Sequence, residues 1–412
     1  MSRVLEEQEE IGGRIRRRRL NMGLTQADLG DALGKTQGWV SKVEKGLIEL
    51  DRSALISRLA AALHCHPNDL IRRPYDHRPT SENRWQESAL LIIRELRRYD
   101  LAPTFIGTPR PAAELWQETK RLSRLRDAAA STAVLKSVPD LLRESRALAE
   151  VGSGSEQEGA WAMYAVLCKF AHTAANALGH AELTALACER AEWAARLSGD
   201  PLMQTVAAGV RVSSMWASAD YKDALALGDK SLAGIQEIYD AGDPLALGVW
   251  GAAQLRAAVS ASRDGNRDET EARIGYAKEA AGRMDALTER PFDRYNLNFS
   301  TGNVTIHGIA VELEMGDHVN ALDLNEQADP RQIATLPNSR RGHHHMDLAR
   351  AYMWENQRDK AFTELAEAER LARELVTNHP VARATLRKIL HSERTATREA
   401  QRLMASRFRL DA

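Results

Sequence analysis

The sequence is poor in aromatic residues, in cysteine and in long apolar runs. Aromatic side chains make up 5% of the 412 residues, and there are only three cysteines (Cys65, Cys168 and Cys188), none of them in a CxxC pair. A disulfide framework is therefore not expected, and a reducing setting fits best. No apolar stretch approaches the length of a membrane span, and the N-terminus MSRVLEEQEE lacks the apolar core of a signal peptide. We expect a cytoplasmic protein that does not bind membranes.

Motifs of known catalytic sites are also missing. The chain has no Gly-rich phosphate loop, no HExxH or GxSxG motif and no paired carboxylates, so we expect no enzyme and no cofactor. The run HCH at residues 64–66 has no second ligand pair at zinc spacing, so no metal is predicted. In the run HHH at residues 343–345, consecutive helical side chains point about 100° apart and cannot hold one ion. Of these three, at most His343 is expected to face a groove.

The residues that are plentiful favour helices. Ala and Leu are common, charged residues make up 27% of the chain, and Pro and Gly cluster at intervals. The length fits two or three domains. The charge is uneven, because residues 11–73 hold 12 Lys and Arg against 6 Asp and Glu while the whole chain has a net charge of −1. A basic head on a mildly acidic body is typical of a tethered nucleic-acid-binding module.

The basic head has the signals of five short helices. The predicted helices cover residues 11–22, 25–33, 36–45 and 53–63, and a last one opens at Pro67. In the first helix we expect Ile15 and Leu20 to face inward and the arginines at 14 and 16–19 to point largely outward. Thr25, with Asp28 three residues further on, is a predicted N-cap in a capping-box position. Five short helices of this kind form one compact bundle.

The head also carries a family resemblance. LTQ at residues 24–26, LG at 33–34, SKVEKG at 41–46 and LAAAL at 59–63 have the order and spacing of the Cro and phage-repressor type helix-turn-helix, and the head resembles this XRE family. The resemblance implies that a Gln opening the second helix and polar residues near the start of the third contact DNA. The implied residues are Gln26, Thr36, Gln37, Gly38, Trp39, Ser41 and Lys42. Arg18 and Arg19, beside the motif, are predicted to meet phosphates. Trp39, where the family often has Thr or Ser, either stacks on DNA or folds back onto the bundle.

The rest of the chain is divided by regularly spaced breaks. We assign residues 1–74 to the DNA-binding domain, 75–110 to a polar linker with a bridging helix, and 111–412 to a repetitive body. Tight turns are predicted at 179, 220, 265–266, 316–317 and 356–357, and looser ones at 199–201, 242–244, 290–291, 329–330 and 379–380. Each unit is a helix, a tight turn, a second helix and a looser turn, about 40 to 50 residues in all, and this period predicts a helical-pair solenoid.

One unit of the body, residues 339–373, is similar to the tetratricopeptide (TPR) pattern. Leu348, Ala349 and Tyr352 in its first helix are followed by small and apolar residues at 361, 365 and 368 of its second. The whole chain resembles the large actinobacterial helix-turn-helix regulators with TPR-like bodies. It is more distantly similar to the RRNPP peptide-responsive regulators of Gram-positive bacteria. We therefore expect an all-α protein, with a five-helix repressor-type helix-turn-helix domain followed by a TPR-like helical-pair solenoid.

A TPR superhelix lines its concave face with the first helix of each pair. Residues 291–315 are predicted to be such a helix. The predicted effector-binding residues are Asn296, Phe299, Asn303 and His307, which would form one stripe on it, together with His343 and Arg350 beside the groove. Asparagine offers a donor and an acceptor that match a peptide backbone, and the RRNPP resemblance implies this role for Asn296 and Asn303. Alternatively, the stripe caps helices and satisfies neighbours inside the stack.

Together these predictions describe a transcriptional regulator. The head binds operator sites in double-stranded DNA, as a homodimer on an inverted repeat, because one head covers only a few base pairs. The body dimerises and senses a peptide or small-molecule effector, as in quorum sensing. Two alternatives remain. The body could bind a protein partner with no small effector, or an enzyme could be fused to the helix-turn-helix.

Overall fold

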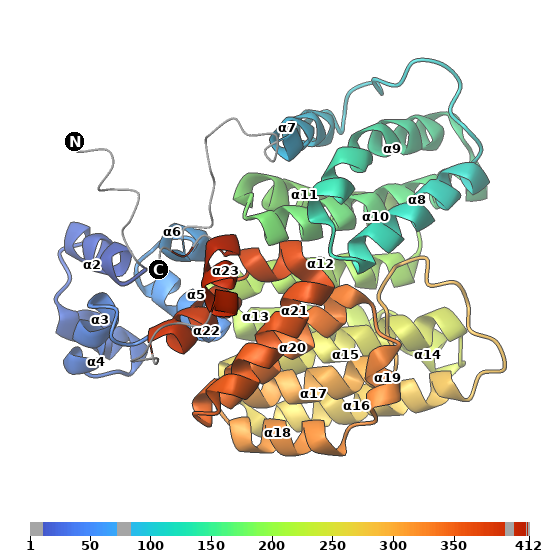
Figure 1. Ribbon diagram of the computed structural model, residues 1–412. Coiled ribbons are helices and arrows are strands. Elements are labelled where there is room, and N and C mark those ends of the chain that lie inside the picture. The colour runs from blue at the N-terminus through green and yellow to red at the C-terminus, as the bar shows by residue number, and fades with distance from the viewer. Residues whose placement is uncertain (1–10, 72–83, 392–398, 409, 411–412) are drawn as a thin grey trace.

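The computed structural model describes residues 11–71, 84–391, 399–408 and 410, and every regular element within them is a helix (Figure 1). The all-α prediction is confirmed. The predicted domain boundary at residues 74–75 and nearly all of the polar linker lie outside the described residues. None of the described helices is long and apolar enough to cross a membrane.

Five short helices form the N-terminal head. They are α2 (Ile11–Asn21), α3 (Gln26–Leu33), α4 (Gln37–Glu44), α5 (Ser53–Ala62) and α6 (Pro67–Ile71). Their apolar faces meet in one core that includes Ile15, Leu29, Val40 and Leu59. The inward orientation predicted for Leu20 is wrong, because its side chain is 55% exposed. The preceding residue of α2, an arginine, takes the buried position instead.

Capping residues set the boundaries of the head helices. Thr25 Oγ1 accepts a hydrogen bond from the Asp28 N–H at 3.1 Å, and Asp28 Oδ2 accepts one from the Thr25 N–H at 2.7 Å, so the predicted capping box is present. Gly34 ends α3 with a φ of +64°, which glycine adopts without steric cost. Thr36 Oγ1 then accepts a hydrogen bond from the Trp39 N–H at 3.2 Å and starts α4.

The body is a succession of helical pairs. Its helices are α7 (Arg84–Arg97), α8 (Ala112–Asp127), α9 (Ser131–Val151), α10 (Gly154–Leu178), α11 (Ala181–Leu197), α12 (Pro201–Ser218), α13 (Tyr221–Ala233), α14 (Gln236–Asp240), α15 (Pro244–Asp264), α16 (Arg267–Asp285), α17 (Thr301–Met315), α18 (His318–Gln327), α19 (Pro330–Ala334), α20 (Asn338–Trp354), α21 (Arg358–Asn378), α22 (Pro380–His391) and α23 (Glu399–Arg407). Neighbours pair as α10 with α11, α12 with α13, α15 with α16, α17 with α18 and α20 with α21. The first helices α12, α15, α17 and α20 also contact one another in that order and form one layer.

The breaks predicted in the body coincide with helix ends, except that the one at 290–291 lies inside the loop between α16 and α17. Gly179, Gly265 and Gly316 have φ angles between +82° and +91° and end α10, α15 and α17. At the looser breaks, Asp200 and Asp243 cap helices whose first residue is proline. Proline suits this position because an N–H there would have no partner within the helix. The local signals in the sequence therefore locate the repeats.

The segment from Pro291 to Met315 is not one helix, and that prediction is wrong. The helical part begins only with α17, for which Ser300 is the N-cap. In the preceding loop, Asn296 and Asn298 have φ angles of +48° and +56°, which an α-helix does not allow. The evenly spaced stripe of four residues predicted on this segment therefore does not form.

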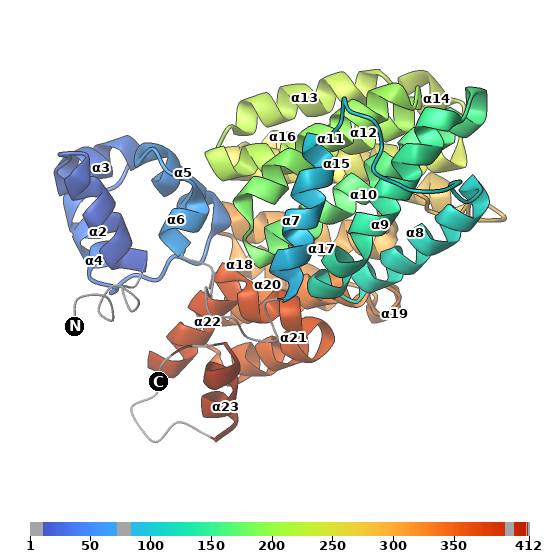
Figure 2. The same ribbon diagram turned by 90° about the horizontal axis from the view of Figure 1, so that it is seen from above.

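The head docks on the body through α5 and the residues just before it (Figures 1 and 2). α5 packs against α12. The Asp51 carboxylate accepts hydrogen bonds from Trp354 Nε1 at 2.7 Å and from Lys388 Nζ at 2.6 Å. The backbone carbonyl oxygen of Asp51 accepts a third from Arg350 Nη1 at 3.0 Å. We call these three bonds the Asp51 docking contact. In both views α3 and α4 lie on the side of the head away from the body, so the body does not cover α4.

Candidate DNA-binding surface and effector cavity

Close backbone packing builds the turn between α3 and α4. A Cβ atom on Gly30 would lie 2.7 Å from the Lys35 carbonyl oxygen, and one on Gly12 would lie 2.3 Å from the Val43 carbonyl oxygen. Only glycine lets the turn and α2 approach their neighbours this closely. These contacts hold α4 in a fixed position on the bundle.

The outer face of α4 carries polar residues predicted to contact DNA. Gln37, Gly38 and Lys42 are exposed, Ser41 is half-buried, and Val40 lies in the core on the opposite face. An amide, a hydroxyl and a cation on a short exposed helix match the base edges and phosphates of a DNA major groove. The arrangement therefore allows α4 to act as a recognition helix.

Trp39 packs onto the head rather than standing away from it. Its ring is half-buried against the head core, and Lys35 Nζ lies 6.0 Å from the ring centroid. Of the two orientations predicted for Trp39, the structure has the one on the bundle. Thr36 is exposed and uses a lone pair of its hydroxyl as the helix cap, so the O–H can still donate to a phosphate.

The outward orientation predicted for Arg19 is wrong. Its side chain is 7% exposed and pairs with Glu44, with Nε 2.5 Å from Oε1 and Nη2 3.0 Å from Oε2. Gln26 Nε2 donates to the same carboxylate at 2.8 Å. Burial alone would raise the pKa of Glu44, but the hydrogen bonds from Arg19 and Gln26 outweigh it and lower the pKa. Arg19 thus ties α2 to α4 and is not available to a phosphate.

Arg18 is exposed and has two hydrogen bonds within the head. Its Nε and Nη2 donate to the carbonyl oxygens of Leu63 and His64 at 3.2 and 2.8 Å, at the carboxyl end of α5. A cation is favourable there because it satisfies the last carbonyl groups of the helix. Arg16 fits a phosphate contact better, because it is exposed and lies close to α4. Its charge helps to lower the pKa of Glu44 at the end of that helix. The sequence of the arginine run at residues 16–19 does not show which of these side chains form contacts within the head.

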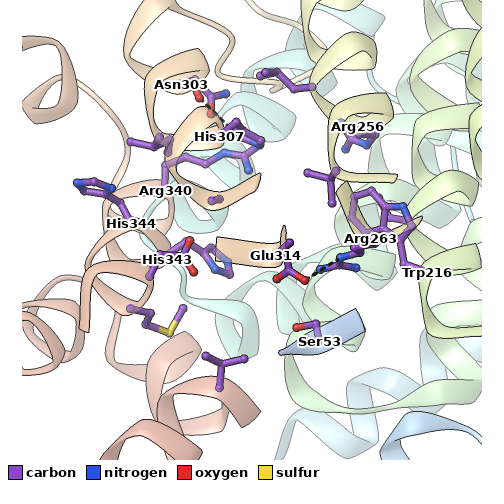
Figure 3. Close-up of a pocket in the computed structure, with 18 of the residues that line it drawn as sticks. Ser53, Trp216, Arg256, Arg263, Asn303, His307, Glu314, Arg340, His343 and His344 are labelled. Carbon is purple, nitrogen blue, oxygen red and sulfur yellow. Dashed lines mark hydrogen bonds and ion pairs between the residues drawn. The ribbon is translucent and has the colours of Figure 1, made fainter. Parts of the chain in front are cut away.

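A cavity of about 310 Å³ lies in the body beside the head (Figure 3). Its walls come from the first helices α12, α15, α17 and α20, and Ser53 of α5 adds a residue from the head. Leu255, Val259 and Ile306 make part of the lining apolar. The volume is at the lower end of the range for small-molecule sites. It suits a small ligand or a few residues of a peptide.

The end of the cavity next to the head is lined by paired charges. The Glu314 carboxylate lies 3.6 Å from Arg263 Nε and 3.6 Å from Arg350 Nη1, and Asp347 Oδ1 lies 3.2 Å from Arg350 Nη2. Burial raises the pKa of Asp347 to about 6, against the opposing effect of the Arg350 charge. Arg350 also donates to the carbonyl oxygen of Asp51. One side chain therefore joins the cavity wall to the Asp51 docking contact.

Comparison with known proteins bears on the head. Residues 10–73 match the model of a helix-turn-helix domain family. The head is a helix-turn-helix domain. No curated protein matches the chain. Among solved structures, it is similar to PlcR from Bacillus thuringiensis in complex with the peptide PapR7 and DNA, at 12% identity over 86% of this chain and 99% of that chain, with a TM-score of 0.24. A likeness this slight carries no argument about the body or its ligand.

Behind the helix-turn-helix domain, four of the six predicted effector residues line the cavity. They are Asn303, His307, His343 and Arg350. The other two are held by their neighbours. Asn296 is buried in the loop before α17, where it accepts a hydrogen bond from Arg126 and donates to Asp127. Phe299 is buried against Gly251, where a Cβ atom would lie 2.0 Å from its ring. Asn296 and Phe299 therefore follow the alternative prediction, in which the side chains contact neighbouring residues inside the stack of helices.

Asn303 and His307 present hydrogen-bond acceptors on the cavity wall. Asn303 is 1% exposed, and its Nδ2 donates to the Asn298 carbonyl oxygen at 2.9 Å. Among the residues that the structure describes, its Oδ1 has no hydrogen-bond partner. His307 Nδ1 lies 2.8 Å from the Asn303 carbonyl oxygen, so Nδ1 carries the proton and Nε2 is the acceptor. Burial lowers the pKa of His307 to about 3, and the ring is therefore neutral at physiological pH.

Several cavity residues were not predicted from the sequence. Arg256 and Arg340 line the cavity, and His344 lines it together with His343, although at most one residue of that run was expected to face a groove. No motif distinguishes these arginines from solvated ones. The available signal is spacing, because Arg256 and Arg263 are seven residues apart on one predicted first helix and therefore share a face.

Proposed function

We propose that this protein is a transcriptional regulator that binds operator DNA through its helix-turn-helix domain and is controlled by a small effector bound in the cavity. One observation carries the proposal. The cavity and the head share a wall, because Ser53 of α5 lines the cavity and Arg350 both lines it and donates to Asp51. A ligand in the cavity therefore acts directly on the contact that positions the head.

Recognition of the operator is assigned to α4. Gln37 at its exposed start reads a base edge, Ser41 and Lys42 lie along the same helix, and Arg16 meets a phosphate. One such helix covers only a few base pairs, so useful specificity needs two heads on half-sites about one helical turn apart. We therefore include a homodimer on an inverted repeat in the proposal, with the body holding the two heads together.

Control requires two positions of the head. In one, the head is docked as described, and in the other the Asp51 docking contact is broken. An effector shifts this equilibrium only by its differential affinity for the two states, typically about 1–3 kcal/mol. Because the cavity wall includes residues of both head and body, its shape differs between the two states, and this difference supplies the differential affinity.

The test begins with operator sites selected from random DNA by the full chain. Affinity for the selected site is then measured with and without the small-molecule fraction of a cell extract. We expect Asn303→Ala to abolish the response while leaving effector-free DNA binding unchanged, since Asn303 lies in the cavity on α17 and is not part of the head. Asn325→Ala, on α18 outside the cavity lining, is the matched control. A wild-type response in Asn303→Ala would exclude the cavity as the effector site. A wild-type protein that does not respond to the small-molecule fraction but responds to the protein fraction would favour a protein partner.

A further inference from the structure

Two arginines of the cavity wall bond to backbone oxygens rather than to the carboxylates of the lining. Arg256 Nε donates to the Gly209 carbonyl oxygen at 2.9 Å, and Arg340 Nη2 lies 3.5 Å from the Leu297 carbonyl oxygen. The two carboxylates of the lining, Glu314 and Asp347, form ion pairs with Arg263 and Arg350 instead. Within the part of the chain that the structure describes, Arg256 and Arg340 form no ion pair. Both side chains are half-buried, and a cation with reduced access to water and no carboxylate in contact is unfavourable.

The two guanidinium groups act on the same space. Arg340 lies beside His307 on one wall of the cavity, and Arg256 lies on the facing wall (Figure 3). Burial lowers the pKa of Arg340 to about 9. The charges of Arg126 and Arg256 add to this effect, and those of Asp127 and Asp293 oppose it. Burial likewise lowers the pKa of Arg256 to about 10, with a contribution from Arg126. The charge of Arg256 thus acts on Arg340, and an anion between the two guanidinium groups would offset this repulsion.

The acceptors at the same end of the cavity define a second requirement. Asn303 Oδ1 and His307 Nε2 can only accept hydrogen bonds, because Asn303 Nδ2 and His307 Nδ1 are engaged with backbone carbonyl oxygens. A buried acceptor without a partner is costly, and a ligand that brings an N–H or O–H group removes the cost. The apolar side of the cavity, which includes Leu255 and Ile306, accommodates the rest of the ligand.

We propose that the cavity binds a small organic anion, with a carboxylate or phosphate held between Arg256 and Arg340 and a neighbouring N–H or O–H donor held by Asn303 and His307. The planar guanidinium fork matches both carboxylate and phosphate oxygens. The inference rests on the proposed function, because it defines by its chemistry the effector left unnamed there.

Two fluorescent probes test the charge requirement on the full chain. 8-Anilinonaphthalene-1-sulfonate carries an anionic group, an N–H donor and apolar rings, and N-phenyl-1-naphthylamine has the same rings and N–H without the anion. We expect the sulfonate to bind one site per chain with a Kd at least tenfold below that of the neutral probe. Equal affinity for the two probes would overturn the proposal.

Variants assign the binding to the cavity. Arg256→Gln and Arg340→Gln should each weaken sulfonate binding at least fivefold and change binding of the neutral probe less than twofold, while Arg340→Lys retains most of the affinity. Arg211→Gln, an exposed arginine on α12, is the control and should bind both probes as wild type does. Both neutral variants should melt at or above the wild-type temperature, because each removes a half-buried charge that has no ion pair among the described residues. Sulfonate binding that is unchanged in both variants would overturn the assignment.

Competition identifies the source of the anion. Displacement of the bound sulfonate by N-acetyl-leucine but not by N-acetyl-leucinamide indicates a carboxylate such as a peptide C-terminus, and displacement by phenyl phosphate alone indicates a phosphate ester. Operator binding is measured separately without any probe. A chain that selects no DNA sequence refutes the proposed function, whereas a chain that selects DNA but binds both probes equally refutes only the anion site.

Discussion

The Asp51 docking contact can be measured with a double-mutant cycle. Asp51→Asn removes the negative charge, and Lys388→Met removes the positive charge while keeping most of the side-chain volume. The two groups lie 2.6 Å apart, with side chains 11% and 28% exposed. Hydrogen bonds to charged groups contribute about 1.5–3 kcal/mol, and fully exposed ion pairs about 0.2–1 kcal/mol. Because Lys388 keeps part of its surface in water, we expect a coupling energy of about 1–1.5 kcal/mol.

Urea unfolding of wild type, both single variants and the double variant gives this coupling energy. The chain offers a matched control in Arg97 and Glu182, which also join two helices at 2.6 Å but have side chains 64% and 54% exposed. For that pair we expect a coupling of about 0.2 kcal/mol, at the lower end of the range for exposed pairs. Equal couplings for the two pairs, or additivity at Asp51 and Lys388 within about 0.3 kcal/mol, would refute the reasoning.

The same variant tests the link to function. A loss of about 1.4 kcal/mol from the docking contact changes the ratio of docked to released heads about tenfold. Asp51→Asn should therefore change operator affinity without any effector, upward if DNA binds the released head and downward if it binds the docked head. Gel-shift titration of the selected operator measures the change. Wild-type affinity in Asp51→Asn, combined with a measured coupling above 1 kcal/mol, would show that docking does not control DNA binding.

Four further perturbations give distinct results. Gln37→Ala should cost about 1–3 kcal/mol on the selected operator and little on random DNA, whereas Lys42→Ala should weaken both and lower the salt slope by about one. Arg19→Ala should destabilise the head by about 3–5 kcal/mol, because it leaves Glu44 buried without its partner. Burial lowers the pKa of His307 to about 3 and that of His343 to about 4, so the unfolded chain binds protons that the folded chain does not. Stability should thus be full above pH 6.5 and fall towards pH 4, by about 1.4 kcal/mol for each histidine at pH 5.5.

Each of these expectations can fail clearly. Equal losses on operator and random DNA would remove Gln37 from base reading. An Arg19→Ala protein that melts at the wild-type temperature would contradict the structural role of that arginine. The raised pKa of Asp347 opposes the two histidines over this range, so the test compares variants. A change in unfolding free energy between pH 6.5 and pH 4.5 that is the same in wild type, His307→Gln and His343→Gln would show that His307 and His343 are solvated in the folded protein.

The head could be predicted from the sequence because its signals are local. A capping box depends on residues three positions apart, such as Thr25 and Asp28, and a left-handed helix end depends on one residue, such as Gly34. The same holds for the repeats of the body, where a capping Asp followed by Pro starts a helix. Signals of this range survive in any tertiary context, and the structure has them at the predicted places.

The orientation of Arg19 and Leu20 shows where local reasoning fails. Ile15 and residue 19 are four positions apart and share one face of α2, so geometry alone places residue 19 inward. Hydrophobicity favours Leu20 for the buried position, but Glu44 is 25 residues away from Arg19 and supplies the charge that allows the arginine to be buried. A partner at that distance in sequence leaves no periodic pattern.

The cavity was only partly predictable for the same reason. Asn296 was assigned to a ligand because asparagine suits one, yet its partners Arg126 and Asp127 lie about 170 residues earlier in the chain. Asn303 donates to the carbonyl oxygen of Asn298, five residues away. This bond, which leaves Asn303 Oδ1 facing the cavity, could be predicted only by knowing that the loop before α17 is not helical. The ion pairs in the cavity could not be predicted either, because the sequence does not show which of several arginines each carboxylate contacts.

The arrangement of α20 explains how an anion in the cavity can act on the head. Arg340 lies near the start of this helix, and Arg350 and Trp354, which supply two of the three bonds of the Asp51 docking contact, lie near its end. Ten helical residues span about 15 Å, so Arg340 and Arg350 are far apart but belong to one stiff element. An anion that draws Arg340 towards Arg256 on α15 displaces α20 relative to α15. Since hydrogen bonds tolerate little displacement, a shift of this helix changes the geometry at Asp51 more than it changes the apolar packing around it.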